Sequence, residues 1–449
     1  MLEIIVAVNE KYGIGLDGKI PWTCKSDLSK FRKITQNGTL IVGRKTCDSL
    51  PKLTERKVVC LSGSGDRGTW KNNVVVISSF EDLDKLIEND PHTRYFVSGG
   101  TSVYNEYMRR RLPVHISYIK DDTKCDTYFD RKLLDGYVVH VREEYDDFTY
   151  MYMTWEGDNS ERQYLDIARR ILLDGTLRAT RNDNVLSVFN GSMVFDLRDG
   201  FPLLTTKKMF LKGIVEELLF FLRGDTDTTV LVDRGVNIWK GNTTKEFIGN
   251  MNLPYAENVM GPMYGYQWRY FNKPYKISEN GTPVKDAGGV DQLNNVVNLI
   301  RTDPTSRRII MTAYNPEQAH EGVLYPCHSI TIQFYVDGEY LDMFCYNRSQ
   351  DFFLGTPYNI ASSSLLLMII AKICNKKPRK FHMSMGDIHI YESHIPVIRQ
   401  QIDRVPFRKP NIEITRDIDD VKDIHDLVFG DFKISGYISH SKLTAQMIA

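Results

Sequence analysis

Apolar and polar residues alternate in short runs along the first 156 residues, and longer stretches with helical spacing separate these runs. Helices are expected at 26–35, 81–88 and 101–108. Strands are expected at 2–8, 40–44, 58–62, 74–78, 94–98 and 114–119, followed by a hairpin of 137–145 and 148–156. This alternation predicts an α/β domain whose central, mostly parallel sheet has helices on its faces.

The pattern changes after residue 156, where the polar stretch "EGDNS" (156–160) leads into a new helix. Ser160 is the expected N-cap of that helix. Its apolar stripe comprises Tyr164, Ile167, Ala168, Ile171 and Leu172. We therefore expect a first domain over 1–156, a short junction over 157–160 and a second domain over 161–449.

The most apolar run, "SLLLMIIAKIC" (364–374), is far shorter than the roughly 20 residues that a membrane span needs. It predicts a buried helix, and no membrane association is expected. Lysine plus arginine and aspartate plus glutamate both number 57 in the 449 residues, so no broad nucleic-acid binding is expected either. The 7 cysteines form no CxxC or Cys/His cluster, which argues against a metal site and a disulfide framework. Scattered thiols and a strand-like N-terminus favour the cytoplasm.

Candidate chemistry in the first half consists of one acid and two glycine-containing turns. Asp27 lies in the first turn of a predicted helix, where an acid commonly just complements the helix dipole. Gly43-Arg44-Lys45-Thr46 and Gly99-Gly100 each stand where a strand gives way to a helix, which is a common phosphate-binding geometry. Either turn alone is a weak signal, but the two together suggest a dinucleotide site.

Cys327 heads a predicted strand in which Ile330, Ile332 and Phe334 form the apolar row. A lone cysteine is more often a small buried apolar residue than a nucleophile. By alternation, however, Cys327 should lie on the polar side of this strand, away from the core. A catalytic thiol also needs a cation and an acid–base group nearby, and Arg348 and Glu217 are candidates. Glu217 should face the core of its apolar helix, with Glu216 the more exposed of the two acids.

The first half resembles dihydrofolate reductase over its whole length, through "GIGLDGKIPW" (13–22), "DLSKF" (27–31), "GRKT" (43–46) and "GGTSVY" (99–104). The resemblance implies that Asp27 holds the pterin and assists protonation at N5 while hydride passes from NADPH. It also implies a cis Gly99–Gly100 bond. The other implied folate-binding residues of this half are Leu28, Phe31 and Arg56. The implied NADPH-binding residues are Ile14, Gly15, Gly43, Arg44, Lys45, Thr46, Ser62, Gly99, Gly100, Val103 and Tyr104.

The second half resembles thymidylate synthase, which has an α+β fold, from about residue 160 to the end of the sequence. Among the matching motifs are "DGFPLLTTKK" (199–208), "GPMYGYQWR" (261–269), "YPCH" (325–328), "NRSQDFFLGTPYNIAS" (347–362) and "GDIHIY" (386–391). The whole chain is thus similar to the bifunctional dihydrofolate reductase–thymidylate synthases. The implied reactions are dUMP methylation by 5,10-methylenetetrahydrofolate, which yields dihydrofolate, and the NADPH-dependent reduction of that product to tetrahydrofolate.

The resemblance makes Cys327 the nucleophile that adds to C6 of dUMP. The other implied catalytic residues are Glu217, Tyr264, His328 and Arg348. The implied dUMP ligands are Arg181, Arg307, Arg308, Arg348, Ser349, Asn359, His389 and Tyr391, and the implied folate ligands are Trp239, Asp351 and Gly355. In the family, the adjacent arginines cross from a partner subunit, which implies a homodimer through the synthase domain.

Two other functions are alternatives to these activities. A binding protein with inactive sites would be favoured by loss of Asp27 or Cys327, but both are present. A hydroxymethylase acting on deoxycytidylate is expected to carry an aspartate in place of Asn359. The phosphate loop "ATRNDNVLSVF" (179–189) is shorter than is usual in the family and lacks its glycines, and the terminal "TAQMIA" is atypical.

Overall fold

In the computed structural model the chain folds as two compact units. One comprises Met1–Asn159 with the segment 405–408, and the other comprises Ser160–Arg404 with Lys409–Ala449. The structure describes residues 2–51, 53, 56–63, 74–90, 92–155, 160–180, 183–284 and 288–448. Within these ranges no helix is both long and apolar enough to cross a membrane.

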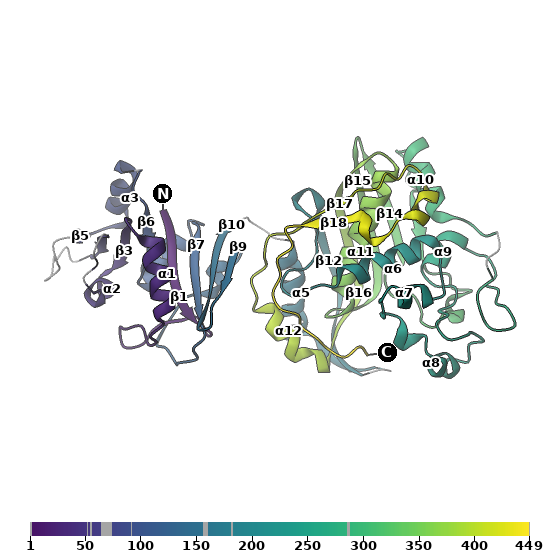
Figure 1. The fold of residues 1–449 in the computed structure, drawn as a ribbon, viewed down its shortest axis with the longest axis horizontal. Helices are drawn as coiled ribbons and strands as arrows, with labels where there is room; N and C mark the ends of the chain where they lie inside the picture. The colour runs from purple at the N-terminus through teal and green to yellow at the C-terminus, as the bar shows by residue number, and fades with distance from the viewer. Residues whose placement is uncertain are drawn as a thin grey trace. The chain divides into compact units, whose positions relative to one another are not determined.

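The first unit is built on an eight-stranded sheet with the order β5-β4-β3-β6-β1-β7-β10-β9 (Figure 1). All pairings from β5 to β7 are parallel, and β10 joins β7 and β9 in antiparallel fashion. The strands are β1 (Leu2–Asn9), β3 (Thr39–Gly43), β4 (Lys57–Leu61), β5 (Val74–Ile77), β6 (Tyr95–Val97), β7 (Val114–Ile119), β9 (Tyr137–Glu144) and β10 (Phe148–Trp155). The predicted mostly parallel sheet is therefore confirmed.

In the described residues four α-helices accompany this sheet: α1 (Lys25–Thr35), α2 (Arg44–Ser49), α3 (Phe80–Asn89) and α4 (Thr101–Met108). A small second sheet pairs β2 (Gly13–Gly15) with β8 (Thr127–Tyr128). Sequence patterns did not predict β2 or β8, whereas the turn after Gly43 had indicated the helix that the structure shows as α2. The implied cis bond between Gly99 and Gly100 is wrong, because the described chain contains no cis peptide bond. Both glycines instead have positive φ angles, of 155° and 86°.

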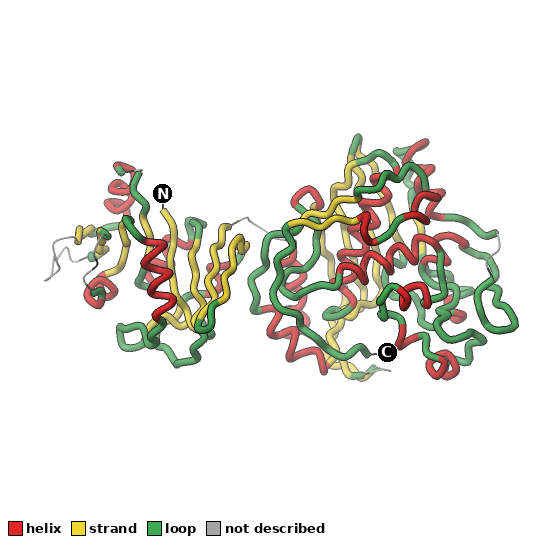
Figure 2. Tube along the Cα trace, in the orientation of Figure 1, coloured by secondary structure: helices red, strands yellow, loops and turns green. Residues whose placement is uncertain are grey.

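The second unit has a mixed six-stranded sheet with the order β11-β12-β16-β15-β14-β13. Only β15 and β16 run parallel. The strands are β11 (Thr176–Ala179), β12 (Asn184–Asp196), β13 (Ile310–Thr312), β14 (Thr331–Asp337), β15 (Tyr340–Asp351) and β16 (Lys377–Tyr391), and a separate pair joins β17 (Asn411–Ile414) to β18 (Phe432–Ser435). The helices are α5 (Glu161–Asp174), α6 (Leu211–Arg223), α7 (Thr229–Asp233), α8 (Lys245–Asn250), α9 (Gly265–Tyr270), α10 (Gln292–Thr302), α11 (Gly355–Ile373) and α12 (Ile395–Ile402), and Figure 2 shows them along the chain.

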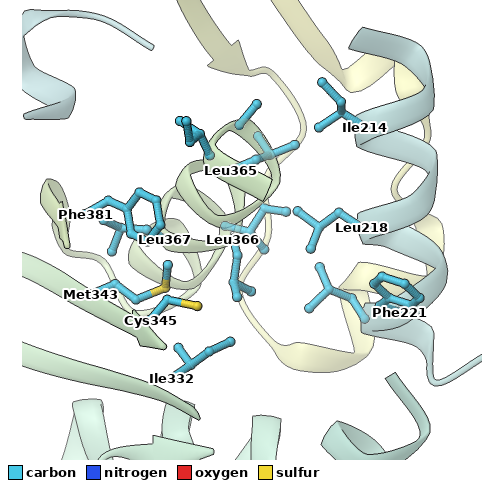
Figure 3. Close-up of a cluster of buried hydrophobic side chains, with 14 of the residues drawn as sticks. Ile214, Leu218, Phe221, Ile332, Met343, Cys345, Leu365, Leu366, Leu367 and Phe381 are labelled. Atoms are coloured by element: carbon cyan, nitrogen blue, oxygen red, sulfur yellow. The ribbon is translucent and has the colours of Figure 1, made fainter. Parts of the chain in front are cut away.

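The core of this unit surrounds α11, the helix predicted from the run 364–374. Figure 3 shows Leu365, Leu366 and Leu367 of α11 between α6 and the sheet strands. Ile214, Leu218 and Phe221 of α6 lie on one side, and Ile332, Met343, Cys345 and Phe381 of β14, β15 and β16 lie on the other. Because this helix is apolar on nearly every face, it is stable only where other elements cover it on all sides.

Ser160 occupies the predicted N-cap position of α5, but its side chain does not cap the helix. Ser160 already has helical backbone angles, φ −58° and ψ −23°, and its side chain makes no capping hydrogen bond. An N-cap residue needs an extended backbone so that its oxygen can reach the next N–H groups. The apolar stripe of α5 is confirmed, with Tyr164, Ala168 and Ile171 fully buried.

Candidate active sites

The two glycine-containing turns of the first unit meet at the carboxyl edge of its parallel sheet. The Gly43 N–H donates a hydrogen bond to the Gly99 carbonyl at 3.0 Å, so the end of β3 touches the turn after β6. A Cβ added at Gly99 would lie 2.6 Å from Cγ2 of Thr46, which leaves no room for a side chain. Ligands of open α/β sheets bind at this edge.

The predicted NADPH ligands are distributed around this edge. Arg44, Lys45 and Thr46 form the first turn of α2, and Val103 and Tyr104 lie in the first turn of α4. Ser62 follows β4, and Ile14 and Gly15 belong to β2. The close packing at Gly43 and Gly99 lets backbone N–H groups approach an anion, so the residues present fit a dinucleotide phosphate.

Asp27 is the buried acid of the first unit. It lies in the first turn of α1 and is 9% exposed. Burial raises the pKa of Asp27, a hydrogen bond with Ser117 partly opposes this, and the charge of Asp147 adds to the rise. Ser117 comes from β7 and Asp147 from the turn before β10. No local sequence signal indicated either residue.

The predicted folate residues Leu28 and Phe31 share α1 with this acid, and Arg56 contacts the same helix. Leu28 and Phe31 follow Asp27 on α1, and Leu28 is 54% exposed. Arg56 is buried; its Nη1 donates to Thr35 Oγ1 at 3.2 Å, and its guanidinium lies 5.8 Å from the Phe31 ring centroid. Leu28 follows the buried acid directly in the chain and exposes an apolar side chain that a ligand could cover.

Cys327 lies in the loop before β14 and contacts Tyr264 twice. The Cys327 N–H donates to the Tyr264 hydroxyl at 3.2 Å, which leaves that hydroxyl proton free to point at Sγ, 3.5 Å away. Burial raises the pKa of the Cys327 thiol, while Tyr264 and Arg348 partly lower it. Strand alternation had placed Cys327 on the polar side of the strand. That argument does not apply to Cys327, because β14 begins only at Thr331 and the φ of 51° at Ser329 interrupts the extended chain before it.

Glu217 lies on α6 and faces the protein core, as predicted, and it is 7% exposed. Burial raises its pKa to about 7, although Trp239 Nε1 donates to its Oε1 at 2.8 Å. The Phe221 ring lies 5.0 Å from Tyr264 and 6.3 Å from Trp239, so the indole that donates to Glu217 belongs to a cluster of aromatic rings. Tyr264 interacts electrostatically with both Cys327 and Glu217.

Glu216 was predicted to be more exposed than Glu217. This prediction is wrong, because Glu216 is 4% exposed and Glu217 is 7% exposed. Arg234 lies 2.6 Å from its carboxylate, and this ion pair allows a second acid of α6 to be buried. His328 stacks on the Tyr264 ring with a centroid distance of 4.4 Å. Burial lowers the pKa of His328 to about 4, so the ring is neutral near pH 7.

Arg348 joins β15 to the cysteine loop. Its Nε donates to the Pro326 carbonyl at 2.8 Å and its Nη2 to the Tyr325 carbonyl at 3.0 Å. Ser349 follows it, and the backbone N–H groups of both residues donate to the Cys327 carbonyl. Arg307 and Arg308 lie apart from this cluster, exposed, just before the edge strand β13. Arg181 lies outside the described residues.

The remaining predicted ligands lie on adjoining parts of β15, α11 and β16. Asp351 pairs in register with His389, and Tyr391 ends β16. Asp351 Oδ1 accepts from the Phe353 and Leu354 N–H groups at 3.1 Å, just before Gly355 begins α11. His389 Nδ1 lies 2.9 Å from Asp387, an orienting carboxylate that sequence reasoning missed. Asn359 lies in α11, and its Nδ2 donates to Gln350 at 3.1 Å.

Comparisons with known proteins match both units. A family model described as dihydrofolate reductase matches residues 1–156, and one described as thymidylate synthase matches residues 162–449. The bifunctional dihydrofolate reductase-thymidylate synthase of Paramecium tetraurelia is 36% identical over 464 residues, which cover 99% of this chain and 98% of that protein. Proteins of the same name from Zea mays and Glycine max are each 33% identical, covering 99% of this chain and 96% and 94% of their own lengths.

Proposed function

The chain belongs to the bifunctional dihydrofolate reductase–thymidylate synthase family, and we propose that the residues described above perform its two reactions. It catalyses reductive methylation of dUMP to dTMP, which converts 5,10-methylenetetrahydrofolate to dihydrofolate, and it reduces dihydrofolate to tetrahydrofolate. We assign the α/β reductase domain to 1–156, the junction to 157–160 and the α+β synthase domain to 161–449.

The contact of Cys327 with Tyr264, in the presence of buried Glu217, is the observation that carries the synthase assignment. The Cys327 thiolate adds to C6 of dUMP, and Arg348 and the Tyr264 hydroxyl stabilise its charge. A carboxyl group with a pKa of about 7 can hold or release a proton near neutral pH, so Glu217 manages proton transfer around the pyrimidine. His328, which is neutral near pH 7, stacks on the Tyr264 ring and so helps to hold that ring in place. Ser349, Asn359, His389 and Tyr391 bind dUMP, together with Arg181, and Trp239, Asp351 and Gly355 face the folate.

In the reductase site, buried Asp27 holds the pterin and stays protonated to a higher pH than an exposed aspartate. Leu28, Phe31 and Arg56 bind the rest of the folate. NADPH, when bound, supplies the hydride. Arg44, Lys45 and Thr46 hold its phosphates with the Gly99–Gly100 turn, and Arg44 is the candidate for selecting a 2′-phosphate.

One assay separates the two sites. The full chain is mixed with dUMP, 5,10-methylenetetrahydrofolate and NADPH, and dihydrofolate formation and NADPH oxidation are followed by absorbance. Cys327→Ala should form no dihydrofolate but should still oxidise NADPH when dihydrofolate is supplied. Dihydrofolate formation by this variant would overturn the nucleophile assignment.

We also propose that the synthase domain forms a homodimer through one face of its six-stranded sheet. A row of side chains in register crosses this face on neighbouring strands: Val194, His382, Phe344, Gln333 and Ile310. Val194, Phe344 and Ile310 are 39%, 42% and 48% exposed, and Tyr335 nearby on β14 is 65% exposed. Three of the five side chains in this row are apolar and partly exposed, and such an apolar row across a sheet face favours a protein–protein interface. The exposed Arg307 and Arg308 would then reach the phosphate in the partner subunit's site.

Subunit mixing tests this arrangement. Cys327→Ala and Arg308→Ala homodimers should each be nearly inactive as synthases. After unfolding and refolding together, the mixed dimer has one site with an intact cysteine and an intact arginine, so up to a quarter of wild-type activity should return. No recovery would argue against donation of Arg308 across the dimer.

The free thiols of all the cysteines fit a reducing compartment such as the cytoplasm.

A further inference from the structure

Gln350 is a buried polar residue that the mechanism above does not use. It lies on β15 between Ser349 and Asp351 and is 1% exposed. Every polar atom of its side chain nevertheless has a partner, and one of these partners is Asn359. A buried amide with this many hydrogen bonds has a defined orientation.

The orientation of Gln350 follows from the Ser349 carbonyl. Gln350 Nε2 donates to that carbonyl oxygen at 3.2 Å. Since a backbone carbonyl can only accept, the amide nitrogen of Gln350 must face it and the amide oxygen must face away. Gln350 Oε1 then accepts from Thr356 Oγ1 at 3.0 Å and from Asn359 Nδ2 at 3.1 Å.

This network fixes the Asn359 amide in turn. Its nitrogen faces Gln350 Oε1, because a flipped Asn359 would bring two amide oxygens together. Gln350 cannot relieve that repulsion by flipping as well, because its own oxygen would then face the Ser349 carbonyl. Asn359 Oδ1 and one remaining N–H are therefore available to a ligand in a single arrangement.

That arrangement matters because uracil and cytosine differ by exchange of a donor and an acceptor. Uracil presents N3–H as a donor and O4 as an acceptor, whereas cytosine presents N3 as an acceptor and its 4-amino group as a donor. An asparagine free to flip could match either edge, since its two ends have nearly the same shape. A fixed asparagine matches one edge and leaves unpaired polar groups against the other.

We propose that Gln350 is a positioning residue that makes the synthase site select uracil over cytosine by holding the Asn359 amide in one orientation. This inference rests on the proposed role of Asn359 as the residue that reads the pyrimidine edge. Gln350 contributes no contact to the substrate in this scheme.

Affinities for dUMP and dCMP, measured by calorimetry on the full chain, test the proposal. The two nucleotides share sugar and phosphate, so the ratio of their dissociation constants isolates the base. Gln350→Met keeps the length of the side chain but removes its hydrogen bonds. The preference for dUMP should fall about tenfold, the worth of one buried hydrogen bond. A preference that stays within a factor of two of wild type would overturn the proposal.

Gln318 provides a matched control. It is also buried, and its Oε1 also accepts from an asparagine Nδ2, that of Asn315, at 3.1 Å. Gln318→Met should therefore cost similar stability and leave the dUMP preference unchanged. Gln350→Glu retains an oxygen facing Asn359, and its carboxyl, protonated in this buried position, can still donate to the Ser349 carbonyl. This variant should keep the preference, which allows a test even if Gln350→Met does not fold. Loss of preference in Gln350→Glu would count against the proposal.

Asn359→Asp separates this inference from the proposed function. If Asn359 reads the base, this variant should reverse the preference toward dCMP. An unchanged preference would refute the role of Asn359 itself. Reversal in Asn359→Asp with no change in Gln350→Met would refute only the role of Gln350. Since a carboxylate is symmetric, adding Gln350→Met to Asn359→Asp should shift the ratio no further.

Discussion

Glu217 and Asp27 are carboxylic acids that the fold buries, and their charged forms are costly in both places. Their partners differ in position along the chain. Glu217 accepts from Trp239, and Asp27 interacts with Ser117. The apolar neighbours of Glu217 on one helix predicted its burial, whereas Ser117 reaches Asp27 only because β7 packs beside α1. A sequence pattern carries the first kind of information and not the second.

Glu217→Gln should stabilise the protein while it impairs the synthase. The carboxyl group titrates near its ordinary value of 4.5 in the unfolded chain and near 7 in the folded chain. The folded chain binds more protons between these values, so the free energy of unfolding falls as pH rises through them. Glutamine lacks this charge, so its advantage over wild type should be absent below pH 4 and reach on the order of 3 kcal/mol above pH 7. Urea unfolding of both proteins across this range measures it, and a constant difference would contradict the assignment.

The raised pKa of Asp27 should appear in the pH dependence of the reductase reaction. Protonation assists hydride transfer, so the rate should fall as pH rises through the pKa of Asp27. Ser117 lowers that pKa, and Ser117→Ala should therefore move the falling limb to higher pH. Single-turnover hydride transfer against pH measures the shift.

Asp27→Asn serves as the companion to this experiment. It should abolish the pH limb and strongly reduce hydride transfer, with NADPH affinity unchanged. Equal loss of both properties would contradict the placement of Asp27 on the folate side.

At the level of elements, sequence patterns predicted the main strands and helices of the first unit, but they did not predict the long strands β12, β15 and β16 of the second unit. The helices α1 and α4 and the strands of the parallel sheet have enough residues for their periods to show. The strands β2 and β8 have three and two residues, too few for a period to show, so packing decides their conformation. The cluster of Cys327, Glu217 and Tyr264 was predicted by motif resemblance. The contact of Gln350 with Asn359 required the packing of β15 against α11. Asp387 lies two residues before His389 on β16, so strand alternation could have indicated that pair.

The contact between α6 and α9 holds Tyr264 over Cys327. A Cβ at Gly265 would lie 2.1 Å from the Phe221 carbonyl oxygen, so Gly265→Ala must push the two helices apart. We expect a loss of about 1–3 kcal/mol in the free energy of unfolding and a large drop in synthase turnover. Gly249→Ala in α8 is the matched control, since a Cβ added at Gly249 would have no other atom within 4 Å. Its stability should be unchanged or slightly higher.

At the scale of the whole molecule, we expect a substitution on the exposed sheet face to impair the synthase reaction and leave the reductase reaction intact. Phe344→Glu places a charge in the middle of the apolar row and should convert the dimer to a monomer. Synthase activity should then fall at least tenfold while dihydrofolate reduction continues, because Asp27 and the NADPH turns belong to the first unit. Analytical ultracentrifugation and the two assays measure these effects.

Leu173→Glu is the control for this variant. Leu173 is 82% exposed but lies on α5 and not on the sheet row, so its replacement should change neither mass nor activity. A dimeric Phe344→Glu protein with full synthase activity would refute the proposed interface.

The apolar row has one more consequence, which concerns protein concentration. In the proposed dimer a second chain completes each synthase site, so the fraction of complete sites equals the fraction of paired chains, which mass action sets. Dilution below the dimer dissociation constant should therefore lower synthase turnover per chain and leave reductase turnover per chain constant. The rate at which each chain converts 5,10-methylenetetrahydrofolate to dihydrofolate would then depend on the protein concentration. The rate at which each chain reduces dihydrofolate to tetrahydrofolate would not.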